Sequence, residues 1–186
     1  LDAYFETVPC NCVLLNNVQG AYLAARHLIR TCKTQPGYLH SAYPISNFAE
    51  RSSGFYKAVR AAGMSSSRSI VHKLTPSMEG AYADMMELIK NGEELAPCYF
   101  ADNDLIAVGA IKALKEADTD PLDIGIVGFD NLPLGSVIEP ALTTIHVPKQ
   151  YMGEAAAQKL IDLLHTPGQP PTKTEVSTML VKRGTV

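Results

Sequence analysis

Residues 98–129 read CYFADNDLIAVGAIKALKEADTDPLDIGIVGF. The apolar run Cys98–Ala101 has the length of a strand, and Leu105–Glu116 has the three-residue apolar spacing of a helix. A second apolar run, Ile124–Phe129, follows. Near-continuous apolar strands are typical of parallel sheets that helices cover on both faces. This stretch therefore predicts a strand–helix–strand unit of an α/β fold.

The same alternation continues toward the N-terminus. Strands are predicted at Cys10–Leu15, Gly37–His40 and Ser69–Lys73, and helices at Gly20–Arg30, Ala49–Ala62 and Gly80–Lys90. Gly63 and Gly92 follow two of these helices, where residues with a left-handed backbone are common. Alternation at this spacing predicts a doubly wound parallel sheet with helices on both faces.

The chain after Pro140 departs from this rhythm. It contains an extended run at Leu142–Val147, a helix at Tyr151–Leu164 and, after a Pro-rich turn, another extended run near Glu175–Val181. Two extended runs around one helix would suit a chain that crosses to a neighbouring lobe and returns.

The composition limits the class of protein. The chain has 186 residues, of which 46% are hydrophobic, which is enough for one domain or two small lobes. Its net charge is −3 and its Lys and Arg residues are scattered, whereas a duplex-binding surface needs clustered cations. We therefore expect that this stretch of chain does not itself bind DNA.

The N-terminus shows no secretory leader, and no apolar run approaches the ~20 residues of a membrane span. We therefore expect a cytoplasmic protein without membrane contact. The cysteines are unevenly spaced and lie in or beside apolar stretches (Cys10, Cys12, Cys32 and Cys98). Because no histidine stands at metal-site spacing from them, we interpret them as buried, reduced thiols and expect no metal site.

Catalytic motifs are not recognisable. No nucleophile elbow, Walker A loop, HExxH pair or GxGxxG loop follows a predicted strand. The five histidines are dispersed, with no evident link to a nucleophile. The sequence predicts neither an enzyme nor a bound cofactor.

Polar residues follow the predicted strands, where ligands bind in open parallel sheets. These positions hold Asn16-Asn17, Ser41 to Asn47, Thr75, Asp102 to Asp104, and Asp130-Asn131. Any one of them could instead cap the next helix or stabilise a turn. Their recurrence along one sheet edge favours a ligand, and amides and carboxylates suit the hydroxyls of a polyol or sugar.

One cation stands out near the start of a predicted helix. Arg51 lies where a positive charge is mildly unfavourable against the helix dipole. It is either a solvated surface residue or a ligand-facing arginine whose planar fork holds hydroxyl or carboxylate oxygens.

Four segments together carry a family resemblance: GAYLAARHLI, ERSSGFYKAV, CYFADNDLIAVGAIKALKEA and DIGIVGFDNLPLGSVIEPALTTIHVP. They are similar in turn to the G-x-x-x-A-x-x-x-L, R-x-x-G-F, AND-x-x-A-x-GA and D-I-x-V-V-G-F-D-D…P-x-L-T-T-I patterns of the lac-repressor family. The match runs in order over nearly the whole chain, and its later two-thirds is the more specific part.

The resemblance implies a periplasmic-binding-protein-like fold of two lobes, with a small effector held in the cleft. The chain would cross between lobes near Leu15–Asn17, near His146–Pro148 and at about 170–174. The C-terminal lobe would comprise residues 17–146 and 172–186. Residues 1–16 and 147–171 would be part of an incomplete N-terminal lobe.

The resemblance also assigns effector-binding positions. Arg51 matches the family's effector-clamping arginine, Asn103 the asparagine of the AND motif, and Asp130 the first aspartate after Gly-Phe. Asp2 matches an acidic or polar pocket position. Asn47 and Thr75 complete the expected effector-binding set, although Thr75 stands where some members carry a stacking aromatic residue.

The chain departs from the family pattern in several places. Asn131 replaces a common second aspartate, Val147 and Pro148 occupy hinge positions that can be polar, and Trp is missing. These departures leave open whether the effector is a sugar, a sugar phosphate or a purine.

The resemblance implies the ligand-sensing and dimerising part of a bacterial transcriptional regulator, a repressor that responds to a small effector such as a sugar. Operator DNA would be bound by an N-terminal helix-turn-helix head outside this chain, and the regulator would be a homodimer. The alternative is a periplasmic sugar-binding protein of a transporter, which shares the fold.

Overall fold

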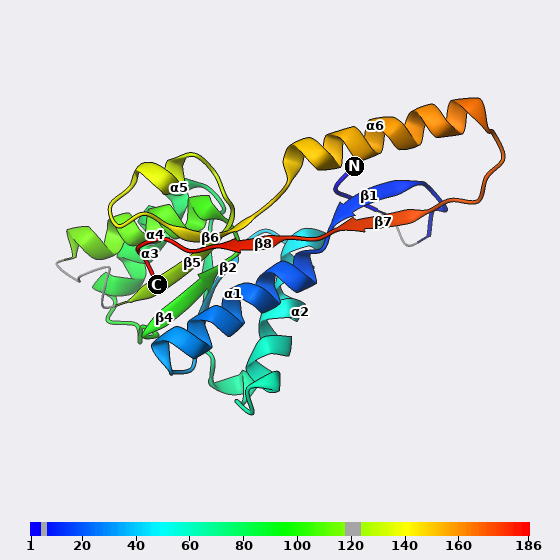
Figure 1. The fold of residues 1–186 in the computed structure, drawn as a ribbon. Helices are drawn as coiled ribbons and strands as arrows, with labels where there is room; N and C mark the ends of the chain where they lie inside the picture. Colours follow the sequence, from blue (N-terminus) through cyan, green and yellow to red (C-terminus); the bar gives the residue numbers. More distant parts are fainter. Residues whose placement is uncertain (5–6, 118–123) are drawn as a thin grey trace.

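A computed structural model describes residues 1–4, 7–117 and 124–186 (Figure 1). The strands are β1 (Cys12–Leu15), β2 (Gly37–Ser41), β3 (Val71–Leu74), β4 (Cys98–Ala101), β5 (Gly125–Asp130), β6 (Thr143–His146), β7 (Lys173–Val176) and β8 (Met179–Val181). The helices are α1 (Asn17–Cys32), α2 (Ser46–Ala61), α3 (Met78–Lys90), α4 (Asp104–Glu116), α5 (Leu134–Val137) and α6 (Lys149–His165). A 3₁₀ turn at Ser66–Arg68 precedes β3.

Local signals account for where several elements begin and end. The side chains of Asn16, Ser77 and Asn103 each accept a hydrogen bond from a main-chain N–H in the first turn of α1, α3 and α4. Gly63 and Gly92 have φ angles of +74° and +70°, which confirms the left-handed backbone predicted after α2 and α3.

The main sheet has the strand order β3-β2-β4-β5-β6-β8 (Figure 1). The first five strands in this order are parallel, and four of them are strands predicted for the parallel sheet. The fifth is β6, whereas the predicted strand at Cys10–Leu15 pairs with β7 in a second sheet. β8 runs antiparallel to β6, so the sheet is mixed. The physical reason is that β8 enters the sheet from β7 and not from a helix that packs back on the sheet, so no parallel crossover places it.

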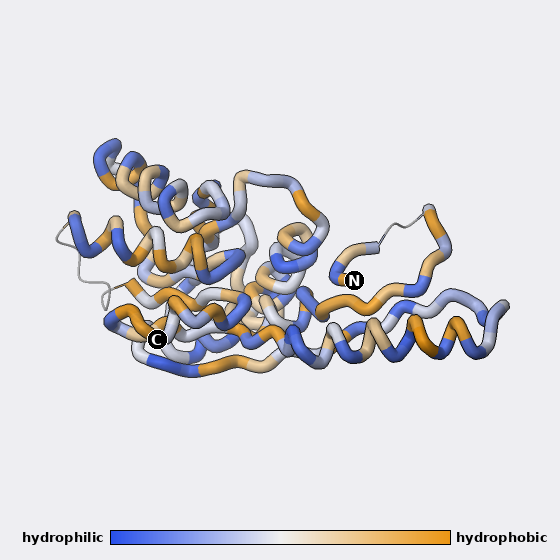
Figure 2. Tube along the Cα trace, turned by 90° about the horizontal axis from the view of Figure 1, so that it is seen from above, coloured by the Kyte–Doolittle hydropathy of each residue, from blue (hydrophilic) through white to orange (hydrophobic). Residues whose placement is uncertain are grey.

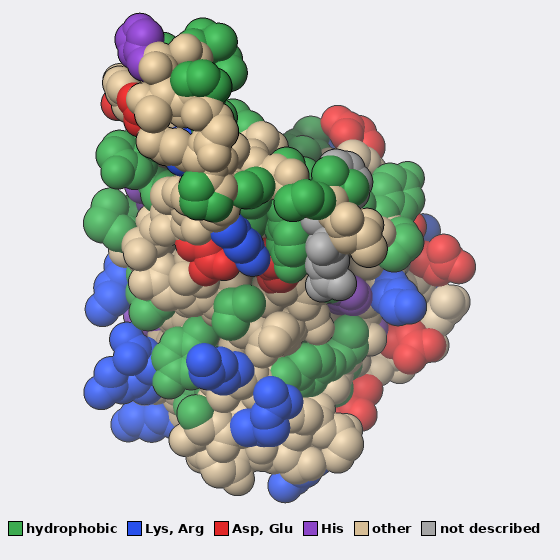
Figure 3. All heavy atoms as spheres, turned by 90° about the vertical axis from the view of Figure 1, so that its right-hand side faces the viewer, with side chains coloured by type: hydrophobic (Ala, Val, Ile, Leu, Met, Phe, Trp, Pro, Cys, Tyr) green, Lys and Arg blue, Asp and Glu red, His purple; other side chains and the backbone are tan. Residues whose placement is uncertain are grey.

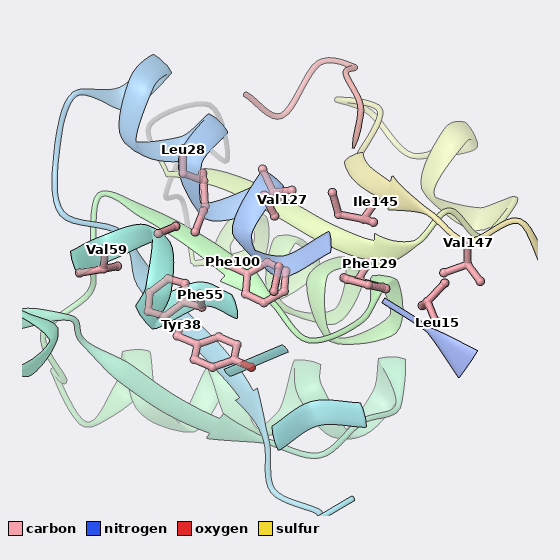
Figure 4. Close-up of a cluster of buried hydrophobic side chains, with 14 of the residues drawn as sticks. Leu15, Leu28, Tyr38, Phe55, Val59, Phe100, Val127, Phe129, Ile145 and Val147 are labelled. Carbon is pink, nitrogen blue, oxygen red and sulfur yellow. The ribbon is translucent and has the colours of Figure 1, made fainter. Parts of the chain in front are cut away.

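Helices cover both faces of this sheet, and each face has its own core. Helices α1 and α2 pack on one face, where Figure 4 shows Tyr38, Phe55 and Phe100 side by side, with Phe129 beyond them. Helices α3, α4 and α5 pack on the other face. The predicted doubly wound architecture is thus confirmed.

A second, smaller sheet extends from the main body together with α6 (Figure 1). It consists of β1 and β7, which pair in parallel, and α6 packs on β1. The chain leaves it after Leu15, enters it after His146 and leaves it again between β7 and β8. Residues 173–176 therefore belong with β1, which corrects their expected place in the C-terminal lobe. The last crossing lies at Ser177 and Thr178, later than predicted.

The predicted final strand Glu175–Val181 is thus two strands in two sheets. The predicted first strand also changes, because β1 begins at Cys12 and leaves Cys10 exposed outside it. The expectation that the cysteines are buried is therefore wrong for Cys10, whereas Cys12 and Cys98 are buried. For both predicted strands, pairing with a distant strand decides which residues belong to a sheet. The local sequence pattern contains no information about that pairing.

Helix α6 buries little of its own surface. Hydrophobic and hydrophilic residues alternate along it in Figure 2, and Met152 is its one fully buried residue in the described chain. Tyr151, Leu160, Ile161 and Leu164 are exposed, and Figure 3 shows hydrophobic side chains at the surface at this end of the molecule. No described helix is long and apolar enough to cross a membrane.

Candidate ligand-binding site

A cavity of about 340 Å³ opens where the two sheets meet. Its lining comes from both sides of the junction: Leu1, Asp2, Leu15, Arg51, Asp130, Val147, Lys149 and Met152. Asp130 ends β5, so the cavity lies at the carboxyl edge of the main sheet, as predicted for a ligand site.

Arg51 is the most constrained side chain at this cavity. It is only 5% exposed, and its guanidinium lies 3.7 Å from the centre of the Phe129 ring. Its Nε donates to Asn17 Oδ1 at 3.0 Å, and its Nη1 donates to the main-chain carbonyl of Asp102. Its Nη2 lies 3.4 Å from Asp130 Oδ1. The structure therefore excludes the alternative that Arg51 is a solvated surface residue.

Asp130 presents its carboxylate to the same cavity. Its φ of +107° is unusual for a residue other than glycine and turns the chain sharply at the end of β5. Burial raises the pKa of its carboxyl above the ordinary value, while the charges of Arg51 and Lys149 oppose that shift. The Asp130 side chain remains 26% exposed, so a ligand can reach it.

Lys149 is a site residue that the sequence analysis missed. Its Nζ donates to the main-chain oxygen of Asp130 at 2.9 Å, and the side chain is exposed. Because an ammonium has three donors, donors remain for a ligand. Lys149 follows Pro148 at the start of a helix, and nothing in the sequence distinguishes it from an ordinary surface lysine.

Asp2 and Asn47 lie together at the edge of the cavity. Asn47 Nδ2 donates to Asp2 Oδ2 at 3.2 Å, and the main chain of Asp2 donates to Val13 of β1. Asp2 lines the cavity, whereas Asn47 reaches it only through Asp2. The structure thus brings together four of the six predicted site residues: Arg51, Asp130, Asp2 and Asn47.

Asn103 and Thr75 do not line this cavity. Asn103 is 8% exposed, and its Oδ1 accepts from Ile106 N at 2.8 Å as the cap of α4. Thr75 follows β3 at the sheet edge, three strands away from β5, which is about 14 Å at ordinary strand spacing. Its main-chain N–H donates to Asp84. Ligand contact by these two residues stays a prediction.

Two buried carboxylates lie behind the site. Asp102 is fully buried and accepts hydrogen bonds from Tyr38 Oη, His40 Nδ1 and the main-chain N–H of Ser41. It anchors the end of β4 to the end of β2, which steadies the carbonyl that Arg51 contacts.

Asp104 ties α4 to the strands beside the cavity. It accepts from Thr144 Oγ1 at 2.5 Å and from Leu132 N at 2.7 Å. Burial raises the pKa of this carboxyl to about 6, although both hydrogen bonds lower it. Because Leu132 follows Asn131 and Asp130, Asp104 helps to hold the turn that carries the Asp130 carboxylate.

The cavity combines charged and apolar groups. Its side chains offer carboxylates, a guanidinium and an ammonium beside the apolar groups of Leu15, Val147 and Met152. No hydroxyl or thiol nucleophile lines it among the described residues. Within the same part of the chain, no group of three or more His, Cys, Asp and Glu side chains is placed to hold a metal ion.

Residues 25–186 match the periplasmic binding protein-like domain family. The chain is 33% identical over 178 residues to the HTH-type transcriptional regulator GalR of Escherichia coli, which covers 94% of this chain and 51% of that protein. It is 32% identical over 175 residues to the HTH-type transcriptional repressor PurR of Klebsiella pneumoniae, with 94% and 51% covered. The chain thus spans about half the length of these curated relatives.

Two of the solved structures with a similar fold are regulators with a bound sugar. A LacI family transcriptional regulator from Enterococcus faecium with bound ribose superimposes with a TM-score of 0.85 at 29% identity, over 94% of this chain and 65% of that one. The transcriptional regulator CelR in complex with cellobiose gives a TM-score of 0.86 at 25% identity, over 97% and 56%.

Proposed function

The chain belongs to the periplasmic binding protein-like domain family, in the form found in LacI/GalR-type regulators, and we propose that it senses a small effector for a bacterial transcriptional regulator. The effector is a sugar. The observation that carries this proposal is a cavity to which both sheets contribute, with Arg51 and Asp130 paired at its wall.

The chemistry of the cavity supports a sugar. Asp130 and Asp2 accept hydrogen bonds from hydroxyl groups, and Arg51 and Lys149 donate to hydroxyl or ring oxygens. Leu15, Val147 and Met152 provide apolar contact for C–H groups. The ribose and cellobiose seen in two similar regulators belong to the same chemical class.

An effector that binds at the junction of the two sheets can control the activity of the regulator. A ligand that touches residues of both sheets stabilises those arrangements in which both sets of contacts are made. Leu15 and Asp2 lie on the β1 side, and Arg51 and Asp130 on the main-sheet side. The effector therefore biases the angle between the two parts and, through it, the activity of the regulator.

Operator DNA and a second copy of the chain are the proposed macromolecular partners. DNA is bound by a helix-turn-helix head outside this chain, in a cytoplasmic homodimer. The relatives are HTH-type regulators and not enzymes, which favours this reading over a periplasmic sugar-binding protein of a transporter. Because the relative PurR is a transcriptional repressor, repression is the proposed direction of control.

Calorimetric titration of the full-length protein with D-ribose, D-galactose and cellobiose tests the proposal. We expect one of these sugars to bind, and Asp130→Ala to weaken that binding by about tenfold to a hundredfold without loss of folding, because one charged hydrogen-bonding group contributes about 1.5–3 kcal/mol. Asp162→Ala on the exposed face of α6 is the matched control. Unchanged affinity in Asp130→Ala would reject this cavity as the effector site.

A further inference from the structure

Asn17 has a buried amide side chain that does not serve as the cap of its helix. It is 2% exposed and is the first residue of α1, directly after the crossing from β1. The cap of α1 is the preceding residue, since Asn16 Oδ1 accepts from Gln19 N at 2.9 Å. The side chain of Asn17 points instead to two residues of α2.

Both ends of this amide have a partner. Asn17 Oδ1 accepts from Arg51 Nε at 3.0 Å, and Asn17 Nδ2 donates to Glu50 Oε2 at 2.9 Å. A guanidinium can only donate and a carboxylate can only accept. Glu50 therefore fixes the amide in the one orientation that offers its oxygen to Arg51.

Arg51 needs such a partner because its side chain is long and flexible. Stacking on Phe129 sets the plane of the guanidinium, but the rotation within that plane depends on hydrogen bonds. The contacts with Asp102 and Asp130 hold the two Nη atoms, and Asn17 holds Nε. A guanidinium has five N–H groups, so two remain for a ligand.

We propose that Asn17 is a positioning residue for effector binding. Together with Glu50 it holds Arg51 so that the free N–H groups are in place before the effector arrives. Pre-organisation raises affinity because the ligand does not have to order the arginine. This inference rests on the proposed function, since it acts through the Arg51 of that site.

The sharpest test is a rescue experiment on the full-length protein, with the tightest binder among D-ribose, D-galactose and cellobiose as the probe. Asn17→Ala should weaken binding about tenfold, which is the loss of one hydrogen bond to a charged group. Asn17→Asp should also weaken it, because two carboxylates would then face each other at the Glu50 contact. Glu50→Gln alone should have little effect, since its amide oxygen still accepts from Asn17.

The double variant Asn17→Asp/Glu50→Gln should recover most of the affinity. An aspartate at 17 still accepts from Arg51 Nε, and a glutamine at 50 can donate to it. A merely structural role of Asn17 would not produce this pattern once thermal stability is matched among the variants. Asn91→Asp/Glu79→Gln, which changes two exposed residues in the same way, is the control.

A second measurement does not depend on the effector. The Arg51 Nε–H group should give a slowly exchanging side-chain signal in ¹⁵N NMR, which Asn17→Ala removes and the double variant restores. If none of the sugars binds the wild type, the proposed sugar function fails while this signal still reports whether Asn17 holds Arg51. The inference is overturned if Asn17→Ala keeps the protected signal, or if the double variant binds no better than Asn17→Asp.

Discussion

Arg51 shows what a single side chain contributes at this site. It stacks on one aromatic ring and donates to three groups from three different segments of the chain, those of Asn17, Asp102 and Asp130. A lysine could carry the same charge but has neither the planar stack nor the fork. The geometry, and not the charge alone, is what the site uses.

Replacing Arg51 with Lys should therefore weaken effector binding by roughly tenfold or more, because the planar, multidentate contacts are lost. Calorimetric titration with the sugar that binds the wild type measures the change. Arg68→Lys, at an exposed arginine on the 3₁₀ turn, is the matched control. If Arg51→Lys binds as tightly as the wild type, the guanidinium has no role in recognition.

Asn103 poses a different question, because it caps α4 and was also predicted to bind the effector. Ser is as good a cap as Asn but lacks the amide. Asn103→Ser should keep the stability, whereas Asn103→Ala should lose about 1 kcal/mol. Urea unfolding and sugar titration of both variants separate the two roles. Weaker binding in the stable Asn103→Ser variant supports ligand contact, and normal binding in that variant leaves Asn103 as a cap only.

Among the elements, the first turn of α4 is held to the turn after β5 and to β6 by one carboxylate. Asp104 makes both connections, to Leu132 N and Thr144 Oγ1. Its burial raises the pKa of the carboxyl from 3.8 to about 6. The folded state therefore binds this proton more tightly than the unfolded state does.

The raised pKa of the Asp104 carboxyl makes the free energy of unfolding depend on pH. Between pH 4 and 6 the stability contributed by Asp104 falls as the pH rises, because deprotonation costs more in the folded state. Asp104→Asn stays neutral, so it should be more stable than the wild type above pH 6, by up to about 3 kcal/mol, and equal to it near pH 4. Urea unfolding at each pH, with Asp162→Asn as the control, measures the difference. A constant difference at every pH would contradict the burial argument.

The whole molecule has two hydrophobic cores around one sheet and a small second sheet with α6. On α3, Met85 packs in the second core, whereas Tyr82 and Met86 remain partly exposed.

DNA binding should be missing from the 186-residue chain, because its net charge is −3 and non-specific duplex binding scales with the number of phosphates neutralised. A gel shift at low salt measures this for the chain alone and for the full-length protein. Tight binding by the chain alone would refute the assignment of DNA contact to a separate head. Sedimentation of the full-length protein tests the homodimer, and a monomer at tens of micromolar would refute it.

The sequence alone was sufficient to predict those features that neighbouring residues determine. Strand β4 has the predicted bounds Cys98–Ala101, because Pro97 and Asp102 end the apolar run on either side. The family resemblance predicted effector contact for Arg51 and Asp130, and both side chains line the cavity. Apolar periodicity, caps and strand-end polarity all act within a few residues, so they can be read along the chain.

Strand pairing and side-chain contacts between residues far apart in the sequence were decided only by the tertiary structure. One predicted extended run became parts of β7 and β8 in different sheets, because strand pairing joins residues far apart, as when Leu15 pairs with Val176. Lys149 joined the site, and Asn17 turned toward Arg51, 34 residues away, although nothing in their own neighbourhoods indicated either contact. A hydrogen bond is formed by atoms that meet in space, so its partners are known only once the chain has folded.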